Sequence, residues 1–237
     1  MLFSISGNKK LDASKNGKAE VIGLSLAPNT KSGVNICSDA TPVCITHCLD
    51  ETGLGQVNEN QALRIAKTLY FLLERTEFLN QMLADVERMN KRVRKKSKSL
   101  YVRPNTFSDL AWERISPELF RDPSITWYDY TKSYDRMCDY LEQRPHWPKN
   151  YHLCFSMSEK NQEQCHELLE RGANVAVVVR SDQHKPLRNH PFSQYRWVDG
   201  DQTDLWWYKQ SGVLGLLRAK GSIKRDTEGF VQESMAA

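Results

Sequence analysis

The stretch YHLCFSMSEKNQEQCHELLERGANVAVVV, residues 151–179, decides the fold. Its two ends, residues 151–157 and 174–179, are apolar and β-compatible, which predicts two strands. The polar segment between them predicts a helix that is entered at Ser158 and closed by Gly172. A strand, a helix and a second strand in this order are typical of a parallel β/α unit.

The same alternation extends in both directions along the chain. Residues 19–27, AEVIGLSLA, predict a first strand that Pro28 stops. From about Asn58 to Val93, apolar residues recur with helical spacing, which predicts one long helix or two abutting helices. The other short β-like runs are SLYVRP (99–104), ITWYDYT (125–131), YRWVDGD (195–201) and GVLGLLRAKG (212–221).

These patterns predict an α/β protein built as a parallel β/α array. Six or seven strands in 237 residues fit an incomplete (β/α)6-like barrel best, with a doubly wound sheet as the alternative. The chain is long enough for one substantial core, so we expect a single domain over residues 1–237. Within it we distinguish a cysteine loop (28–57), a helical segment (58–96) and a strand-rich portion (99–231).

The composition is that of an ordinary soluble globular protein, with 40% hydrophobic and 26% charged residues. The N-terminal residues turn polar and lysine-rich at once, unlike a signal peptide, and no window is apolar enough for a membrane span. We therefore expect a cytoplasmic protein without a membrane partner. The sequence carries no signal for its oligomeric state.

Polar side chains gather where the predicted strands end. In parallel β/α folds the carboxyl ends of the strands form the ligand-binding face, so these side chains are candidates for binding a small-molecule cofactor or substrate. The alternative is that turns and helix caps need such residues, which explains Ser158 well. The candidates are Arg103, Asn105, Asp129, Lys132, Ser156, Ser158, Glu159, Arg180, Asp201 and Lys220.

Three of the six cysteines, Cys37, Cys44 and Cys48, fall within twelve residues of the cysteine loop. Clustered thiols form disulfides, zinc sites or iron-sulfur clusters, and a reducing cytoplasm disfavours the disulfide. A structural zinc needs a fourth ligand, for which His47 is poorly directed, whereas a 4Fe-4S cluster can keep one iron open. The third alternative is that these cysteines are small buried hydrophobes.

The remaining cysteines, Cys138, Cys154 and Cys165, lie in apolar or helical contexts that suit core packing. Cys154 is ambiguous because its strand could aim it either into the core or toward the cysteine loop.

An open iron after the first strand of a β/α array resembles the organisation of radical S-adenosylmethionine enzymes. In that superfamily the cofactor chelates the free iron of a three-cysteine cluster. The resemblance implies a 4Fe-4S cluster on Cys37, Cys44 and Cys48 with S-adenosylmethionine as a candidate cofactor. The cysteine spacing, six and then three intervening residues, departs from the superfamily's common three and two.

A second resemblance rests on blocks that cover nearly the whole chain: LSLAPNTKSGVNICSDATPVCITHCLDETGLG, VRPNTFSDLAWE, WYDYTK, PKNYHLCFSMSE, NVAVVV, VDGDQTD and GLLRAKG. In these blocks, taken in order, the chain resembles the gene product 88 family of phages and mobile elements. The resemblance implies a phage or plasmid origin in a bacterial host, and brings no biochemical activity with it.

A basic run at residues 91–98, KRVRKKSK, supports an alternative function in nucleic-acid or host-partner binding, with the cluster or a zinc ion only structural. Its candidate residues are Arg92, Arg94, Lys95 and Lys96, with the aromatics of LWWYKQ (205–210) as stacking surfaces. The simpler interpretation is a helix end whose cations complement the helix dipole. In a strand, at least one of the adjacent Trp206 and Trp207 would pack inward.

Overall fold

The structure, a computed structural model, describes residues 1–4, 18–180 and 190–233. Its strands are β1 (Ala19–Gly23), β2 (Ser99–Arg103), β3 (Ile125–Thr131), β4 (Tyr151–Ser156), β5 (Val175–Val179), β6 (Arg196–Asp199), β7 (Val213–Arg218) and β8 (Val231–Gln232). The α-helices are α2 (Pro42–Thr46), α3 (Asn58–Leu73), α4 (Arg75–Arg94), α5 (Trp112–Ile115), α6 (Tyr134–Leu141) and α7 (Gln162–Glu170). Short 3-10 helices are η1 (Leu49–Glu51), η2 (Gly53–Gln56), η3 (Pro117–Phe120) and η4 (Gly221–Arg225).

The strands form one sheet in the order β1-β2-β3-β4-β5-β7-β6, and every pairing between named strands is parallel. Each of the seven β-like runs in the sequence forms a strand, which confirms the predicted α/β class. The helix predicted after Ser158 is α7, and the long helical segment is two helices that meet at Glu74.

The predicted barrel is not confirmed. β1 and β6 stand at opposite ends of the strand order, and no pairing joins them among the residues that the structure describes. β7 inserts between β5 and β6, so the last two strands of the path run against the order of the chain.

The short strand β8 adds to the sheet where β4 and β5 separate. β4 pairs with β5 only through Val175 and Ala176, and β8 takes its place beside Val178 and Val179. The C-terminal segment thereby reaches the carboxyl edge of the sheet.

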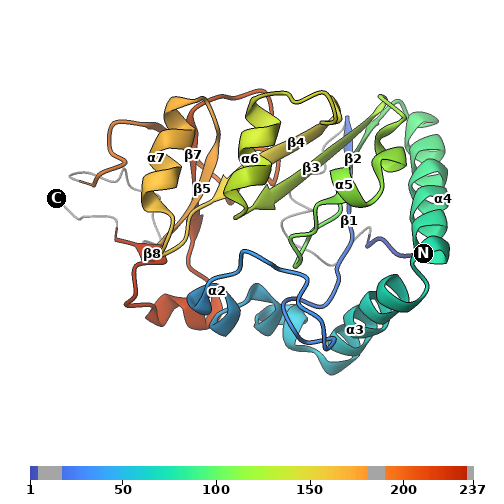
Figure 1. The fold of residues 1–237 in the computed structure, drawn as a ribbon, viewed down its shortest axis with the longest axis horizontal. Helices are drawn as coiled ribbons and strands as arrows, with labels where there is room; N and C mark the ends of the chain where they lie inside the picture. Colours follow the sequence, from blue (N-terminus) through green and yellow to red (C-terminus); the bar gives the residue numbers. More distant parts are fainter. Residues whose placement is uncertain (5–17, 181–189, 234–237) are drawn as a thin grey trace.

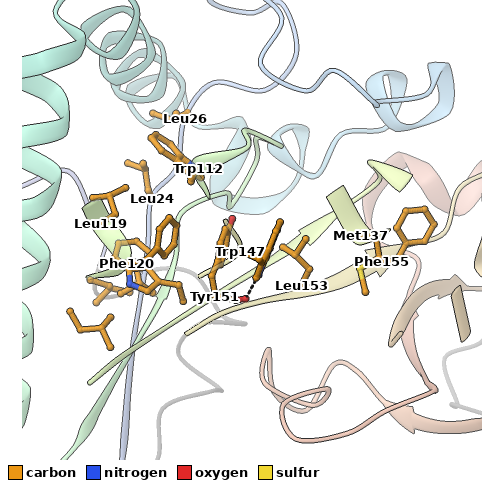
Figure 2. Packing of buried hydrophobic residues seen from close by; sticks show 14 of the residues in the cluster. Leu24, Leu26, Trp112, Leu119, Phe120, Met137, Trp147, Tyr151, Leu153 and Phe155 are labelled. Carbon is orange, nitrogen blue, oxygen red and sulfur yellow. Dashed lines mark hydrogen bonds between the residues drawn. The ribbon is translucent and has the colours of Figure 1, made fainter. Parts of the chain in front are cut away.

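The main core lies between the sheet and its helices, and α6 and α7 cover the same face (Figure 1). Figure 2 shows part of this core, in which Trp147 and Phe120 both stack on Tyr151, with ring centroids 5.6 and 4.6 Å away. Trp147 Nε1 also donates a hydrogen bond to the Tyr151 carbonyl at 2.8 Å. The covered sheet face is therefore aromatic and closely packed.

The opposite face of the sheet is covered by the segment between β6 and β7. Because successive strand residues point to opposite faces, Tyr128 and Cys154 belong to this second core, where Trp206 and Trp207 also pack. Gly215 of β7 leaves room for the Trp206 ring, which a Cβ would meet at 2.1 Å. The expectation that LWWYKQ exposes its tryptophans is wrong, since Trp206 and Trp207 are 5% and 2% exposed.

No helix among the described residues has the length and apolar character that crossing a membrane requires.

Candidate functional site

The cysteine loop lies across the carboxyl ends of the strands, as the sequence predicts. Thr41 Oγ1 donates to Glu159 Oε2, just beyond β4, at 2.8 Å. The His47 ring contacts Ser222 Oγ, beyond β7, also at 2.8 Å. Figure 1 shows α2 on the side of the molecule toward which the β3 arrow points.

The C-terminal part of the loop is anchored by the buried carboxylate of Asp50. Lys31 Nζ approaches one of its oxygens at 2.7 Å, and Arg64 Nη2 of α3 approaches the other at 2.5 Å. The same Arg64 atom donates to the Gly55 carbonyl at 2.5 Å. These contacts fasten the loop to the inner face of α3.

Helix α2 is short because only its first turn is supported. Thr41 caps it by accepting a hydrogen bond from the Cys44 N–H at 3.3 Å, and Pro42 occupies the first turn. The helix ends at Thr46, and Cys48 has left helical geometry with a ψ of 137°. The longer helix that would carry Cys44 and Cys48 on one face is therefore cut short.

The fold nevertheless brings the three loop thiols together. All three are free and partly buried, and each pair among Cys37, Cys44 and Cys48 interacts electrostatically. Cys37 Sγ donates to the Phe107 carbonyl at 3.3 Å and accepts from the Asn29 N–H at 3.3 Å. The three thiols thus lie near enough to one another, at the carboxyl edge of the sheet, for the charge of one to affect the others.

Burial raises the pKa of the Cys37 thiol to about 11 and that of Cys48 to about 11, and the neighbouring thiols add to both shifts. An ordinary cysteine has a pKa of about 8.5, so both groups are protonated near neutral pH. A metal that binds them must displace their protons.

Within residues 1–4, 18–180 and 190–233, no three cysteine, histidine or carboxylate side chains already surround one point closely enough to hold a metal ion. Metal binding at the loop would require the thiols to be drawn closer together. Protonated thiols have no electrostatic reason to converge before a cation arrives.

Lys132 supplies a cation next to the loop. Its Nζ lies 5.6 Å from the centroid of the Phe230 ring, and its charge acts on both Cys37 and Cys165. No carboxylate of the described residues forms an ion pair with it. Lys132 is therefore the predicted site residue best placed to attract an anion to the loop.

Glu159 reaches the loop from the end of β4. Its Oε2 accepts the hydrogen bond from Thr41, whereas its Oε1 is buried without a hydrogen-bond partner. A buried carboxylate oxygen without a hydrogen-bond donor is costly in free energy. Glu159 therefore presents an unsatisfied acceptor beside Thr41, the N-cap residue of α2.

Two other predicted site residues, Asn105 and Asp129, are fully buried in an internal network. Asp129 accepts hydrogen bonds from the backbone and side chain of Asn105 at 3.0 and 2.8 Å, and from Tyr151 Oη at 2.6 Å. Asn105 Oδ1 in turn accepts from Trp112 Nε1 at 3.1 Å. The structure uses both residues to join β2, β3 and β4.

The remaining predicted residues are engaged with other parts of the chain. Arg103 donates to the buried Asp204 at 2.9 Å on the second sheet face, and Lys220 pairs with Asp201 at 2.6 Å. The Arg180 guanidinium holds the C-terminal segment through the Lys224 and Asp226 carbonyls and the Glu233 carboxylate.

Ser156 and Ser158 are part of the turn that precedes α7. The Ser158 N–H donates to Asn161 Oδ1 at 2.6 Å, and Asn161 Nδ2 donates to the Ser156 carbonyl at 3.1 Å. Here the turn interpretation describes the contacts that the structure shows.

The basic run lies at the opposite end of the sheet. Arg92 and Arg94 belong to the last turn of α4, and Lys95 and Lys96 follow it directly before β2 begins. All four are exposed. Their position at the C-terminus of α4 agrees with the helix-dipole interpretation. It also places them at the amino ends of the strands, whereas the cysteine loop lies at the carboxyl ends.

The sequence did not point to Arg136 or to Glu113. Arg136 donates two hydrogen bonds to Glu113, both at 2.9 Å, and a third to Asp109 at 2.7 Å. The Asp109 N–H donates to the Ile36 carbonyl at 3.0 Å, beside Cys37. No signal in the sequence sets Arg136 apart, because α6 also carries Asp135 and Asp139. The rule that a buried cation requires paired carboxylates applies only once its burial is known.

These features define a parallel α/β protein with a three-cysteine loop across the carboxyl ends of its strands. The resemblance seen in the sequence blocks extends to the whole chain. The chain belongs to the gene product 88 family, whose profile matches residues 1–234. No curated protein and no solved structure matches it, so the radical S-adenosylmethionine resemblance gains no support from these comparisons.

We expect the buried Asp129 to make stability depend on pH. Burial raises its pKa to about 7, above the value of about 3.9 in an unfolded chain. The folded state therefore favours the protonated acid, and the stabilisation is full below about pH 4 and is lost as the pH rises through 7. Denaturant unfolding of Asp129→Asn should lack this loss, which approaches about 1.4 kcal/mol per pH unit between pH 4 and 7.

The comparison needs the wild type and Asp129→Asn at several pH values between 4 and 8, with their difference in unfolding free energy plotted against pH. A difference that stays constant over this pH range would show that Asp129 is ionised throughout and that its pKa is not raised.

Proposed function

We propose that the chain binds a 4Fe-4S cluster through Cys37, Cys44 and Cys48. The observation that carries this proposal is that one loop at the carboxyl edge of a parallel sheet holds three free, partly buried thiols that influence one another electrostatically. This edge is where α/β proteins place their ligands.

The donor set fits such a cluster. Cysteine thiolates are its usual ligands, and three of them leave one iron free for an exogenous group. Glu159 Oε1 is buried without a hydrogen-bond donor, and the other oxygen of this carboxylate accepts from Thr41. Oε1 could accept a hydrogen bond from the exogenous group or bind the free iron itself. When bound, the cluster would supply one-electron chemistry, with Lys132 attracting an anionic ligand toward it.

Zinc fits less well because a structural zinc site is normally closed by four protein ligands. The ring of His47, the histidine nearest in sequence, already has Ser222 Oγ as a hydrogen-bond partner at 2.8 Å. Cys154, the other candidate fourth ligand, is buried in the second core, where its thiol donates to the Asn174 carbonyl at 3.4 Å.

Changing any one loop cysteine to serine should remove most of the iron, because three ligands of one cluster act as a unit. Anaerobically purified wild type should be brown with about four irons per chain. The matched control is Cys138→Ser on α6, a half-buried free thiol that accepts from Arg171 at 3.2 Å. Iron retained by Cys37→Ser, Cys44→Ser and Cys48→Ser, or a colourless protein with stoichiometric zinc, would refute the cluster.

As a finer proposal, the open iron takes S-adenosylmethionine. Electron paramagnetic resonance of the reduced protein should then change on adding S-adenosylmethionine, because its amino and carboxylate groups would bind the cluster. Reduction should also release 5'-deoxyadenosine. An unchanged spectrum with no cleavage would exclude S-adenosylmethionine and leave a cluster-binding protein.

A second candidate function, nucleic-acid binding, is favoured by the outer face of α4. Arg88, Lys91, Arg92 and Lys95 lie on one side of this helix and line a shallow depression with Ala84 and Glu87. A second depression beside it is lined by Arg92, Lys96 and Lys98, together with Glu20, Met89 and Val93. A continuous basic stripe suits a phosphate backbone, but the buried Trp206 and Trp207 provide no stacking surface.

This candidate predicts that replacing Lys95 and Lys96 with glutamine weakens binding of a single-stranded oligonucleotide and lowers its salt slope by about one per lost contact. The control removes two exposed cations from η4, through Lys224→Gln and Arg225→Gln. Equal binding by both double variants, at every salt concentration, would exclude the α4 face as the nucleic-acid site.

A further inference from the structure

The exposed apolar side chains of the protein are concentrated in one part of the chain. Among the described residues, nine large hydrophobic side chains are exposed, and eight of them fall between residues 34 and 73. They are Val34, Ile45, Leu49, Leu54, Val57, Leu63, Leu69 and Leu73. Exposed apolar side chains mark an interaction surface where they gather on one face, whereas single exposed leucines do not.

The solvent-facing side of α3 carries the most regular part of this surface. Its exposed residues include Ala62, Ala66, Leu69 and Leu73, which are spaced four, three and four apart. This is the heptad spacing with which one helix packs against another. Leu73 is 76% exposed, more than any other large hydrophobic residue in the described part of the chain.

This face carries no charge between Glu59 and Glu74. The two charged residues of the interval, Arg64 and Lys67, both turn toward the protein. Arg64 is buried against Asp50, and Lys67 Nζ donates to the Leu2 carbonyl at 2.7 Å. Because the outer face is uncharged, it can meet an identical face without repulsion. The exposed outer face of α4, by contrast, is basic and would repel a copy of itself.

We infer that the outer face of α3 pairs with α3 of a second copy, antiparallel, about a two-fold axis between positions 67 and 68. In this register Ala62 faces Leu73 of the second copy, and Ala66 faces its Leu69. Large side chains then lie over small ones from position 62 to position 73, as close packing of two helices requires. A parallel pair would oppose alanine to alanine and leucine to leucine and leave a gap at one end.

The two-fold arrangement uses the same patch on both subunits, which is the commonest symmetry of protein dimers. Leu54 and Val57 extend the apolar surface at the start of α3, where Asn60 Nδ2 holds the Leu54 carbonyl at 2.9 Å. This inference does not depend on the cysteine site.

The first test is sedimentation equilibrium of the full chain. The wild type should have about twice the monomer mass of 27.4 kDa, and the Ala66→Glu and Leu69→Lys variants should each be monomeric. Both positions are exposed, so circular dichroism and the melting temperature should show that folding is retained. The matched control, Ala84→Glu on the exposed side of α4, should remain dimeric.

The second test fixes the register. Mixing Ala66→Glu with Leu69→Lys should restore a dimer, because one chain's glutamate then faces the other chain's lysine while the second Ala66–Leu69 contact is native. If the wild type is monomeric at all concentrations, the outer face of α3 does not bind a second copy and the inference is overturned. Dimers that survive both single changes, or a mixture that stays monomeric, overturn the α3 interface or its antiparallel register.

Discussion

The position of the loop segment that carries Cys37 depends on one buried guanidinium. Arg136 holds Glu113 of α5 and Asp109 of the preceding loop, and removing one partner from such a buried ion pair typically costs about 3–5 kcal/mol. Asp109 in turn binds the backbone of Lys132 at the end of β3 and the backbone of Ile36. The same interaction therefore fixes the strand ends, the cation beside the thiols and the segment that carries Cys37.

Parallel topology separates the two charged features of the chain. All strands run the same way, so the loop cysteines lie at one edge of the sheet and the basic end of α4 lies at the other. Helix α3 connects these regions and has two different faces. Its inner face binds the cysteine loop through Arg64, and its outer face exposes alanine and leucine side chains. A ligand at the loop and a partner on α3 can therefore be accommodated independently.

The strands and long helices could be predicted because they follow local periodicity. Residues 125–131, 151–156 and 175–179 form strands, and each is a β-compatible run that the sequence alone marks out. The candidate site was harder to predict, because polar residues after strands serve turns, internal networks and ligands alike. Asn105 and Asp129 look like ligand-binding residues in sequence, yet they bind each other beneath the surface.

The sequence by itself determined the α/β class, the order of strands and helices, the family, and the loop that carries the three cysteines. Only the tertiary structure decided which polar groups stay available. Trp206 and Trp207 look exposed in a polar segment but cover a second core, and Arg136, unremarkable in sequence, organises the carboxyl edge. The physical reason is that periodicity is local, whereas burial and pairing depend on residues brought together from distant parts of the chain.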